Sequence, residues 1–113
     1  MVSKALVAAS TKPLVLAILR RGENYGYQII QSVRELSGGK LEWSEPMLYP
    51  LLKRMERDGL IRSEWKLTEN NRFRRYFRLT DKGLEEQEQD RAEWSLVNDV
   101  FGKVLELAPL PEK

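Results

Sequence analysis

The hydrophobic positions of the chain recur with two different periods, and the change of period separates helical segments from extended ones. Apolar side chains three or four residues apart predict amphipathic helices over residues 11–20, 25–36 and 46–58. Pro13 suits a first helical turn, so we expect the first helix to begin near Thr11 or to be kinked there, with residues 2–9 available for an extra turn or two. Glycines just past the apolar segments mark the helix ends, at Gly22, Gly38 and Gly59.

Two segments after the third helix alternate apolar and polar side chains, which is the period of a strand with one buried face. In residues 60–67 the side chains expected to face the core are Ile61, Trp65 and Leu67. In residues 73–79 they are Phe73, Phe77 and Leu79. The polar residues 68–72 between the segments predict a turn, so the two strands should form a β-hairpin.

A long helix is predicted to close the chain. Thr80 or Asp81 provides its N-cap, and Pro109 ends it after about Leu107. The resulting order predicts a mainly α protein with a small β-hairpin: a winged helix-turn-helix domain (helix–helix–helix–strand–strand) plus a long C-terminal helix. We expect this domain to occupy residues 1–80, the helix residues 81–108 and a short tail residues 109–113.

The composition removes several classes of function. The 113 residues suffice for one compact domain, and they include no histidine and no cysteine. The chain therefore lacks the commonest general base, the thiolate nucleophile and the commonest metal ligands, so we expect no enzyme, no metal site and no cofactor. The alternative is an enzyme or a magnesium site built from carboxylates alone. The longest apolar run, residues 14–19, is far shorter than the roughly 18 residues that cross a bilayer. The absence of cysteine and of a secretion signal fits a cytoplasmic location.

The charge of the chain is unevenly distributed. Residues 1–82 carry 16 basic side chains against 9 acidic ones, whereas residues 83–113 carry 3 against 8. A basic body with an acidic C-terminal part suits a domain that meets a polyanion with one part only. The alternative is a chance asymmetry between solvated faces.

The predicted fold brings two DNA-binding elements together. A helix can enter the major groove and present its exposed face and N-terminal residues to base edges, while cations of the hairpin, or wing, hold phosphates. The candidates on the third helix, all expected to be exposed, are Ser44, Met47, Tyr49, Lys53 and Arg57. The candidates on the wing are Lys66, Arg72, Arg74 and Arg75. An alternative for the arginines is that their charge only protects the hairpin edge from aggregation.

Several motifs resemble the PadR family of bacterial transcriptional regulators, in order over residues 12–107. They are Tyr25-Gly26-Tyr27, Leu48-Tyr49-Pro50 with Leu52-Lys53-Arg54-Met55-Glu56, Asp58-Gly59-Leu60-Ile61, and Arg75-Tyr76-Phe77-Arg78-Leu79-Thr80-Asp81-Lys82-Gly83. The resemblance, strongest to the subfamily with a single C-terminal helix, implies a dimeric repressor that binds double-stranded DNA at a palindromic operator and is released by a small molecule. It adds Tyr27 to the DNA-binding candidates.

Two positions within the motifs need separate treatment. Tyr49 matches the family tyrosine that approaches the DNA backbone, and its alternative role is a half-buried ring at the junction of helix and wing. Pro46-Met47 stands where the family usually has a Gly-Thr pair, so a thioether replaces a hydroxyl that could reach a phosphate or a base. The operator sequence is therefore not predictable from the family.

The C-terminal helix carries an apolar stripe formed by Trp94, Val97, Phe101 and Val104, with spacings of 3, 4 and 3. Pairing with a second copy would cover the stripe and supply two recognition helices for two half-sites. The alternative is packing against the first helix of the same chain, and the two are compatible.

The resemblance also suggests a ligand site. Trp94 aligns with a tryptophan that, in multidrug-binding members of the family, stacks with its symmetry mate on flat aromatic compounds at the dimer interface. By the same alignment the cavity is lined by Leu14, Trp94, Asn98 and Phe101. Two indole faces can hold a planar cation by stacking and cation–π attraction. The alternative is that Trp94 is ordinary core packing.

A different class of function remains open alongside DNA binding. A winged helix can also serve as a protein–protein interaction module, and its charged wing would then only be solvated. Salt separates the two hypotheses, because DNA binding is driven by counterion release and weakens steeply as salt rises, whereas a protein interface does not follow that law.

Overall fold

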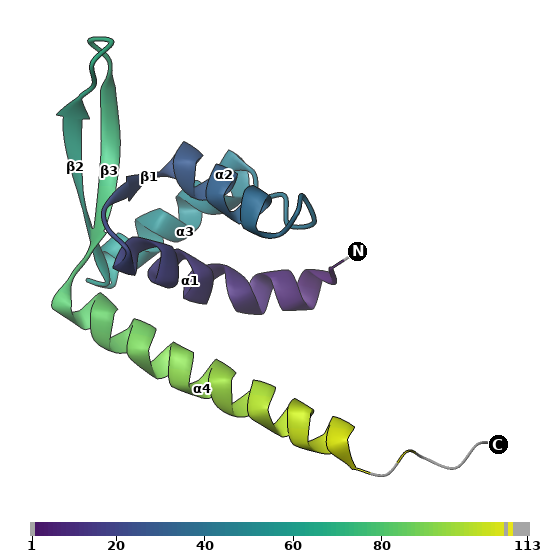
Figure 1. The fold of residues 1–113 in the computed structure, drawn as a ribbon. Helices are drawn as coiled ribbons and strands as arrows, with labels where there is room; N and C mark the ends of the chain where they lie inside the picture. Colours follow the sequence, from purple (N-terminus) through teal and green to yellow (C-terminus); the bar gives the residue numbers. More distant parts are fainter. Residues whose placement is uncertain (1, 108, 110–113) are drawn as a thin grey trace.

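Seven elements follow one another along the chain in the computed structural model, which describes residues 2–107 and 109 (Figure 1). They are α1 (Lys4–Arg20), β1 (Asn24–Tyr25), α2 (Gly26–Leu36), α3 (Glu45–Arg57), β2 (Ile61–Leu67), β3 (Phe73–Leu79) and α4 (Asp81–Glu106). This order confirms a mainly α winged-helix fold with a long last helix. Residues 108 and 110–113, within the expected end of the helix and the tail, lie outside the described residues. None of the described helices has the length and hydropathy to cross a membrane.

Helix α1 is longer than the segment 11–20 predicted from its hydrophobic spacing. It begins at Lys4, where the Ser3 side chain caps it by accepting a hydrogen bond from Leu6 N, so the expected start near Thr11 is wrong and the extra N-terminal turns are present. Pro13 lies inside the helix and cannot donate to the carbonyl one turn earlier. The hydroxyls of Ser10 and Thr11 donate to carbonyls of the preceding turn. The helix nevertheless continues through the proline as far as Arg20.

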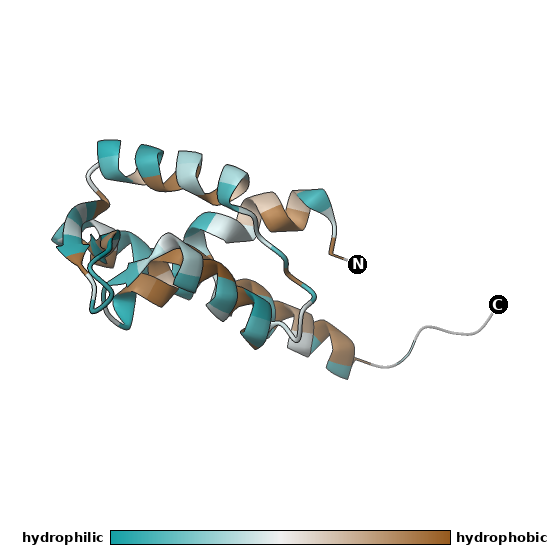
Figure 2. Cartoon of the chain, turned by 90° about the horizontal axis from the view of Figure 1, so that it is seen from above, coloured by the Kyte–Doolittle hydropathy of each residue, from teal (hydrophilic) through white to brown (hydrophobic). Residues whose placement is uncertain are grey.

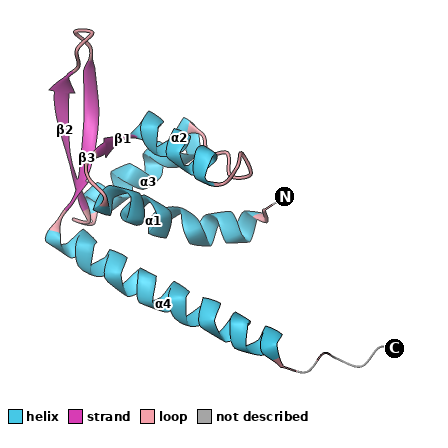
Figure 3. Ribbon diagram, in the orientation of Figure 1, coloured by secondary structure: helices cyan, strands magenta, loops and turns pink. Residues whose placement is uncertain are grey.

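The sheet has a third strand that the hydrophobic pattern did not predict. Its order is β1-β3-β2, all antiparallel, with Asn24 opposite Phe77 and Tyr25 opposite Tyr76 (Figure 3). Tyr25, expected inside the second helix, lies in β1, and α2 begins one residue later at Gly26. A strand of two residues is too short to show an alternating pattern, which is why sequence periodicity missed it.

The hydrophobic core lies between α1, α2, α3 and the base of the hairpin. Its largest fully buried side chains are Leu16, Ile29, Leu48, Leu52, Met55, Ile61 and Phe77. The outer half of the hairpin projects beyond this core (Figure 1). The expectation that Trp65, Leu67 and Phe73 face the core is therefore wrong: Trp65 is 63% exposed and Phe73 67%. Apolar and polar side chains alternate in these segments as in a strand with one buried face. In the outer half of the hairpin, however, no helix covers that face.

Helix α4 leaves the core soon after it begins. Within Asp81–Glu106 the buried residues are Gly83 and Gln87. Near that end polar contacts join α4 to α1: Arg20 Nη1 donates to Gln87 Oε1 at 2.6 Å, and Lys12 Nζ lies 2.7 Å from Glu86 Oε2. Further along, the two helices diverge, and the second half of α4 carries many hydrophobic residues (Figures 1 and 2). Residues 91–107 are exposed.

Gly83 allows the start of α4 to pack closely against the winged-helix domain. A Cβ at this position would lie 2.0 Å from the Leu60 carbonyl oxygen, which is backbone and cannot move aside. Gly83→Ala should therefore lower the free energy of unfolding by about 2–3 kcal/mol through overpacking. The measurement is urea denaturation followed by circular dichroism.

Gly102→Ala is the matched control for this prediction, because a Cβ at Gly102 meets no atom within 4 Å. In the same helix it should raise the free energy of unfolding by about 0.5–1 kcal/mol through reduced chain entropy of the unfolded state. Equal effects of the two substitutions would show that the close approach at Gly83 is unimportant.

Candidate nucleic-acid interface

Helix α3 presents one face to solvent. Leu48, Leu52 and Met55 bury its inner face in the core. The exposed residues of the helix on the opposite side include Pro46, Pro50, Lys53 and Arg57, and Ser44 stands exposed at the N-cap. The Ser44 side chain makes no capping hydrogen bond, so its hydroxyl remains available to a ligand. Of the predicted base-facing residues, Ser44, Lys53 and Arg57 are therefore accessible.

Met47 lies elsewhere on α3. Its side chain is half-buried and packs against the core on the flank that faces α1, where it lines a groove with Val7 and Thr11. The expectation that it is exposed with Lys53 is wrong. The physical reason is helical geometry, because Met47 is one position from buried Leu48 and four from half-buried Leu51.

Tyr49 lies on the other flank of α3, against the start of α2. A Cβ on Gly26 would lie 2.7 Å from Tyr49 Oη, so the ring can lie there only because residue 26 is glycine. Burial raises the pKa of the Tyr49 hydroxyl above its ordinary value, and the negative charge of Glu45 raises it further. The hydroxyl therefore stays protonated at neutral pH and can donate a hydrogen bond. The ring is still 41% exposed, so packing and ligand contact are compatible.

Tyr27 lies in the first turn of α2, and its ring is more than half exposed. Gln31 Nε2 donates to Tyr27 Oη at 2.7 Å, which orients the phenol and leaves its own proton free to donate.

Arg75 is held in a network that joins the wing to α3. Its Nη2 donates to Glu56 Oε1 at 2.7 Å and its Nε to Ser63 Oγ at 2.9 Å. Ser63 in turn donates to Glu56 Oε2 from its hydroxyl at 2.6 Å and from its backbone N–H at 3.0 Å. These hydrogen bonds, first those from Ser63, together with the positive charge of Arg75, hold the pKa of Glu56 below its ordinary value. Arg75 and Ser63 therefore fix the wing relative to α3.

The other wing cations differ in how exposed they are and in whether they are paired with a carboxylate. Lys66 forms an ion pair with Glu23, which raises the pKa of the ammonium group. The Arg74 guanidinium lies 4.3 Å from the centre of the Tyr25 ring, a cation–π contact that leaves the side chain exposed. Arg72 is exposed in the turn at the wing tip. Arg72 and Arg74 are thus more accessible than Lys66 and Arg75, a difference that sequence alone could not reveal because Glu23 and Glu56 come from distant segments.

An aromatic groove separates the wing from α2 and α3. It has a volume of about 350 Å³, and we call it the wing groove. Its lining residues are Tyr25, Tyr27, Tyr49, Trp65, Phe73, Arg74 and Arg75. Sequence reasoning placed Trp65 and Phe73 in the core and so missed this surface. Their exposure could have been predicted, because both residues lie in the half of the hairpin next to the turn. A small helical domain does not extend far enough to bury that half.

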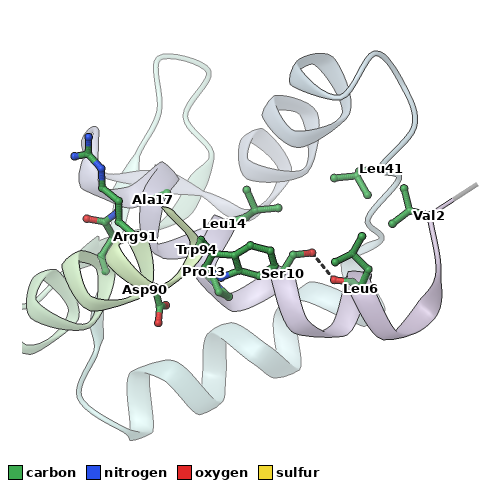
Figure 4. Close-up of a pocket in the computed structure, with 11 residues that line it drawn as sticks. Val2, Leu6, Ser10, Pro13, Leu14, Ala17, Leu41, Asp90, Arg91 and Trp94 are labelled. Carbon is green, nitrogen blue, oxygen red and sulfur yellow. Dashed lines mark hydrogen bonds between the residues drawn. The ribbon is translucent and has the colours of Figure 1, made fainter. Parts of the chain in front are cut away.

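A second and larger groove lies between α1 and α4 (Figure 4). It has a volume of about 680 Å³ and a mainly apolar lining, to which Leu6, Pro13, Leu14 and Trp94 contribute. We call it the α1–α4 groove. Asp90 also lines it, and burial, assisted by the charge of Glu86, raises the pKa of the Asp90 carboxyl group. The groove brings together the predicted ligand residues Leu14 and Trp94; Asn98 and Phe101 are not among its lining residues.

The stripe predicted on the last helix is uncovered in the single chain. Trp94 is 42% exposed and Phe101 63%, with Val97 and Val104 between these values. The apolar surface is also wider than the predicted stripe: the other exposed large apolar side chains in the second half of α4 and at its C-cap are Leu96, Val100, Leu105 and Leu107. The first helix therefore covers Trp94 in part and leaves the rest of the stripe exposed.

Comparison with known proteins agrees with this architecture. The family model described as the transcriptional regulator PadR-like family matches residues 15–89. The structure of a PadR-like transcriptional regulator from Bacillus cereus is 28% identical, with a TM-score of 0.82 over 93% of this chain and 100% of that one. A PadR family transcriptional regulator from Eggerthella lenta is 34% identical, with a TM-score of 0.75 over 92% and 88% of the two chains.

A relative among the curated proteins is considerably longer. The transcriptional regulator YqjI of Escherichia coli is 24% identical over 86 residues, which cover 76% of this chain and 40% of that protein. The present chain thus matches less than half of that regulator.

The Glu56–Ser63–Arg75 network leads to a prediction about pH. Glu56→Gln removes the charge and should lower the free energy of unfolding by about 1 kcal/mol at pH 7, because a charge-assisted hydrogen bond is weakened. Since the pKa of Glu56 is lowered in the folded state, its contribution is complete above the pKa of the unfolded chain and is lost as the pH falls through the folded value.

The check is urea denaturation of both proteins at pH 7 and at a pH low enough to protonate Glu56. The difference between wild type and Glu56→Gln should be present at pH 7 and shrink in acid. A difference of constant size would mean that the carboxylate charge is not what stabilises the network.

Proposed function

Because the chain belongs to the PadR-like family of transcriptional regulators, we propose that it is a repressor that binds a palindromic DNA operator as a homodimer and is released by a small molecule. Membership identifies a regulator and not an enzyme. The observation that best supports DNA as its target is the exposure of cations on both α3 and the wing. Lys53 and Arg57 are exposed on the outer face of α3, and Arg72 and Arg74 are exposed on the wing.

The two elements would make different kinds of contact with DNA. The outer face of α3 would enter the major groove, where Ser44 and Lys53 can reach base edges. Tyr27 and Tyr49 keep phenol protons that can be donated to phosphate oxygens. The wing arginines would supply contacts to phosphates, which position the protein without reading sequence.

The alternative function is a winged-helix module for protein–protein interaction without DNA binding. It predicts no steep salt dependence for a duplex, whereas phosphate contacts release counterions and make the logarithm of the affinity fall linearly with the logarithm of the salt concentration. Sequencing the DNA that the protein retains from its own genome would supply the duplex for this measurement.

We predict that replacing Arg72, Arg74 and Arg75 together with alanine weakens binding to the selected duplex and to random DNA by about the same factor. The salt slope should become shallower by roughly one unit for each phosphate that is no longer neutralised. Since Arg75 already binds Glu56, the single variant Arg75→Ala should change the slope less than Arg72→Ala. Lys103→Ala, on α4, is the charge-matched control and should leave both quantities unchanged. A selective effect on the selected duplex at constant slope would instead make the wing a reader of bases.

The homodimer is proposed on the uncovered surface of α4. An apolar surface this wide on one helix is costly to leave in water, and a second copy would cover it while placing two α3 helices for two half-sites. The residues expected at the centre of the interface are Trp94, Val97, Phe101 and Val104.

We predict a dimer at micromolar concentration and its dissociation in Phe101→Asp, because a buried unpaired carboxylate opposes association. Light scattering should give a mass of about 13 kDa for the variant, against twice that for the wild type. Ser95→Asp places the same residue on the polar side of α4 and should remain dimeric. A wild-type protein that scatters as a monomer at high concentration contradicts the proposal.

The ligand is proposed to occupy the α1–α4 groove. Leu14 and Trp94 offer an apolar wall and a flat ring, and Asp90 offers a negative charge to a cationic compound. Asn98 and Phe101 lie one and two turns further along α4 and would join the site where two copies meet. A ligand that prefers one separation of the two DNA-binding units would shift DNA affinity by its differential affinity for the two states, typically about 1–3 kcal/mol.

We predict that planar aromatic cations quench tryptophan fluorescence and bind one per dimer. Trp43 and Trp65 contribute background emission, so Trp94→Phe is the required control and should abolish most of the quenching. Fluorescence titration with a panel of such compounds is the measurement. Equal quenching of wild type and Trp94→Phe, or none at all, would leave Trp94 with a packing role only.

A further inference from the structure

The wing groove contains a surface that the phosphate contacts of the proposed function do not use. Trp65 and Phe73 are each more than 60% exposed, and both line the groove. The strand register places Trp65 opposite Arg75 and Leu67 opposite Phe73, so Leu67 shares their face of the hairpin. This is a patch of large apolar side chains in the middle of the surface proposed to meet DNA.

The position of the groove between α3 and the wing determines what would lie in it. If α3 enters the major groove of a duplex and the wing reaches the adjacent minor groove, the strand that separates these two grooves must pass between the two elements. That strand is an alternation of charged phosphates and deoxyribose rings, whose carbon faces are apolar. The lining shows the same alternation of chemistry, with aromatic rings from Trp65 and Phe73 beside the guanidinium groups of Arg74 and Arg75.

We propose that the wing groove binds one segment of the sugar–phosphate backbone, with Trp65 and Phe73 packing against deoxyribose rings. The inference rests on the proposed DNA binding and adds to it an apolar contact that does not depend on salt. Charge supports nucleic acid as the occupant: the exposed Arg74 lines the groove, Arg75 lines it while paired with Glu56, and the described lining residues include no carboxylate. The adjoining outer face of α3 carries Lys53 and Arg57, so the cationic surface continues past the groove.

Apolar and ionic contacts have different signatures, and this makes the proposal testable. Removing a phosphate contact changes both the affinity and the salt slope, because a counterion is no longer released. Removing an apolar contact to a sugar changes the affinity alone, since the transfer of apolar surface from water releases no counterion. The deoxyribose ring is the same at every nucleotide, so the weakening should not depend on sequence.

The first experiment measures the dissociation constant of the full-length protein for the selected duplex and for a random duplex of equal length, over a range of salt. Trp65→Ala and Phe73→Ala should each weaken both complexes about tenfold, with the salt slope of the wild type retained. Trp65→Phe, which keeps an aromatic ring, should stay within about twofold of the wild type. Leu36→Ala, at an exposed leucine on the far end of α2, is the matched control and should have no effect.

The second experiment observes Trp65 directly through quenching of its fluorescence by acrylamide. Trp43 is buried and Trp94 is 42% exposed, so Trp65, at 63%, contributes most strongly to quenching of the free protein, and Trp65→Phe separates its share from that of Trp94. Adding duplex should reduce the quenching constant of the wild type severalfold, and the reduction should be absent in Trp65→Phe.

Each outcome decides the matter. If the wild type binds DNA but Trp65→Ala and Phe73→Ala bind it equally well, or if DNA leaves Trp65 open to acrylamide, the wing groove does not hold the backbone and the proposed function stands without it. If the affinity falls together with the salt slope, the variants have disturbed the arginines, and the apolar contact is rejected. If the wild type binds no duplex at all, the inference and the proposed function fail together.

Discussion

The limited extent of the hydrophobic core is the constraint on which the rest of the structure depends. The core is formed by one face of each of α1, α2 and α3 and by the base of the hairpin, with side chains such as Leu16, Leu48 and Phe77. The outer half of the wing and most of α4 lie beyond that core, so special contacts at their bases hold them in place. At the base of α4 a glycine allows close approach to the Leu60 carbonyl, and at the base of the wing the Glu56–Ser63–Arg75 network joins sheet to helix.

The two projecting elements expose apolar side chains that a self-contained domain would bury. On the wing these are aromatic rings beside guanidinium groups, and on α4 they are a wide hydrophobic surface next to a mainly apolar groove. The difference in chemistry suggests different partners. Mixed aromatic and cationic character suits a sugar–phosphate chain, whereas a broad aliphatic and aromatic surface suits a second copy of the same helix.

Sequence patterns predicted the type of most elements, because amphipathic helices and alternating strands record which side chains face a core. They were less reliable where the same pattern has two meanings. Trp65 and Phe73 alternate as core residues do, yet no helix extends over them. Met47 has the spacing of a residue beside the core and was wrongly expected to be exposed. The strand β1 is too short to carry a pattern, and its pairing depends on Tyr76, some fifty positions away.

The sequence by itself determined the order of the four helices and the two hairpin strands, the family, and the absence of histidine and cysteine chemistry, because these follow from local patterns and from composition. Only the tertiary structure decided which cations are accessible and which are paired. Arg72, Arg74 and Arg75 are alike in the sequence, but Glu56 on α3 holds Arg75, while Arg72 and Arg74 remain exposed. An ion pair depends on the distance between two side chains in space, and the partner of Arg75 lies 19 residues away along the chain.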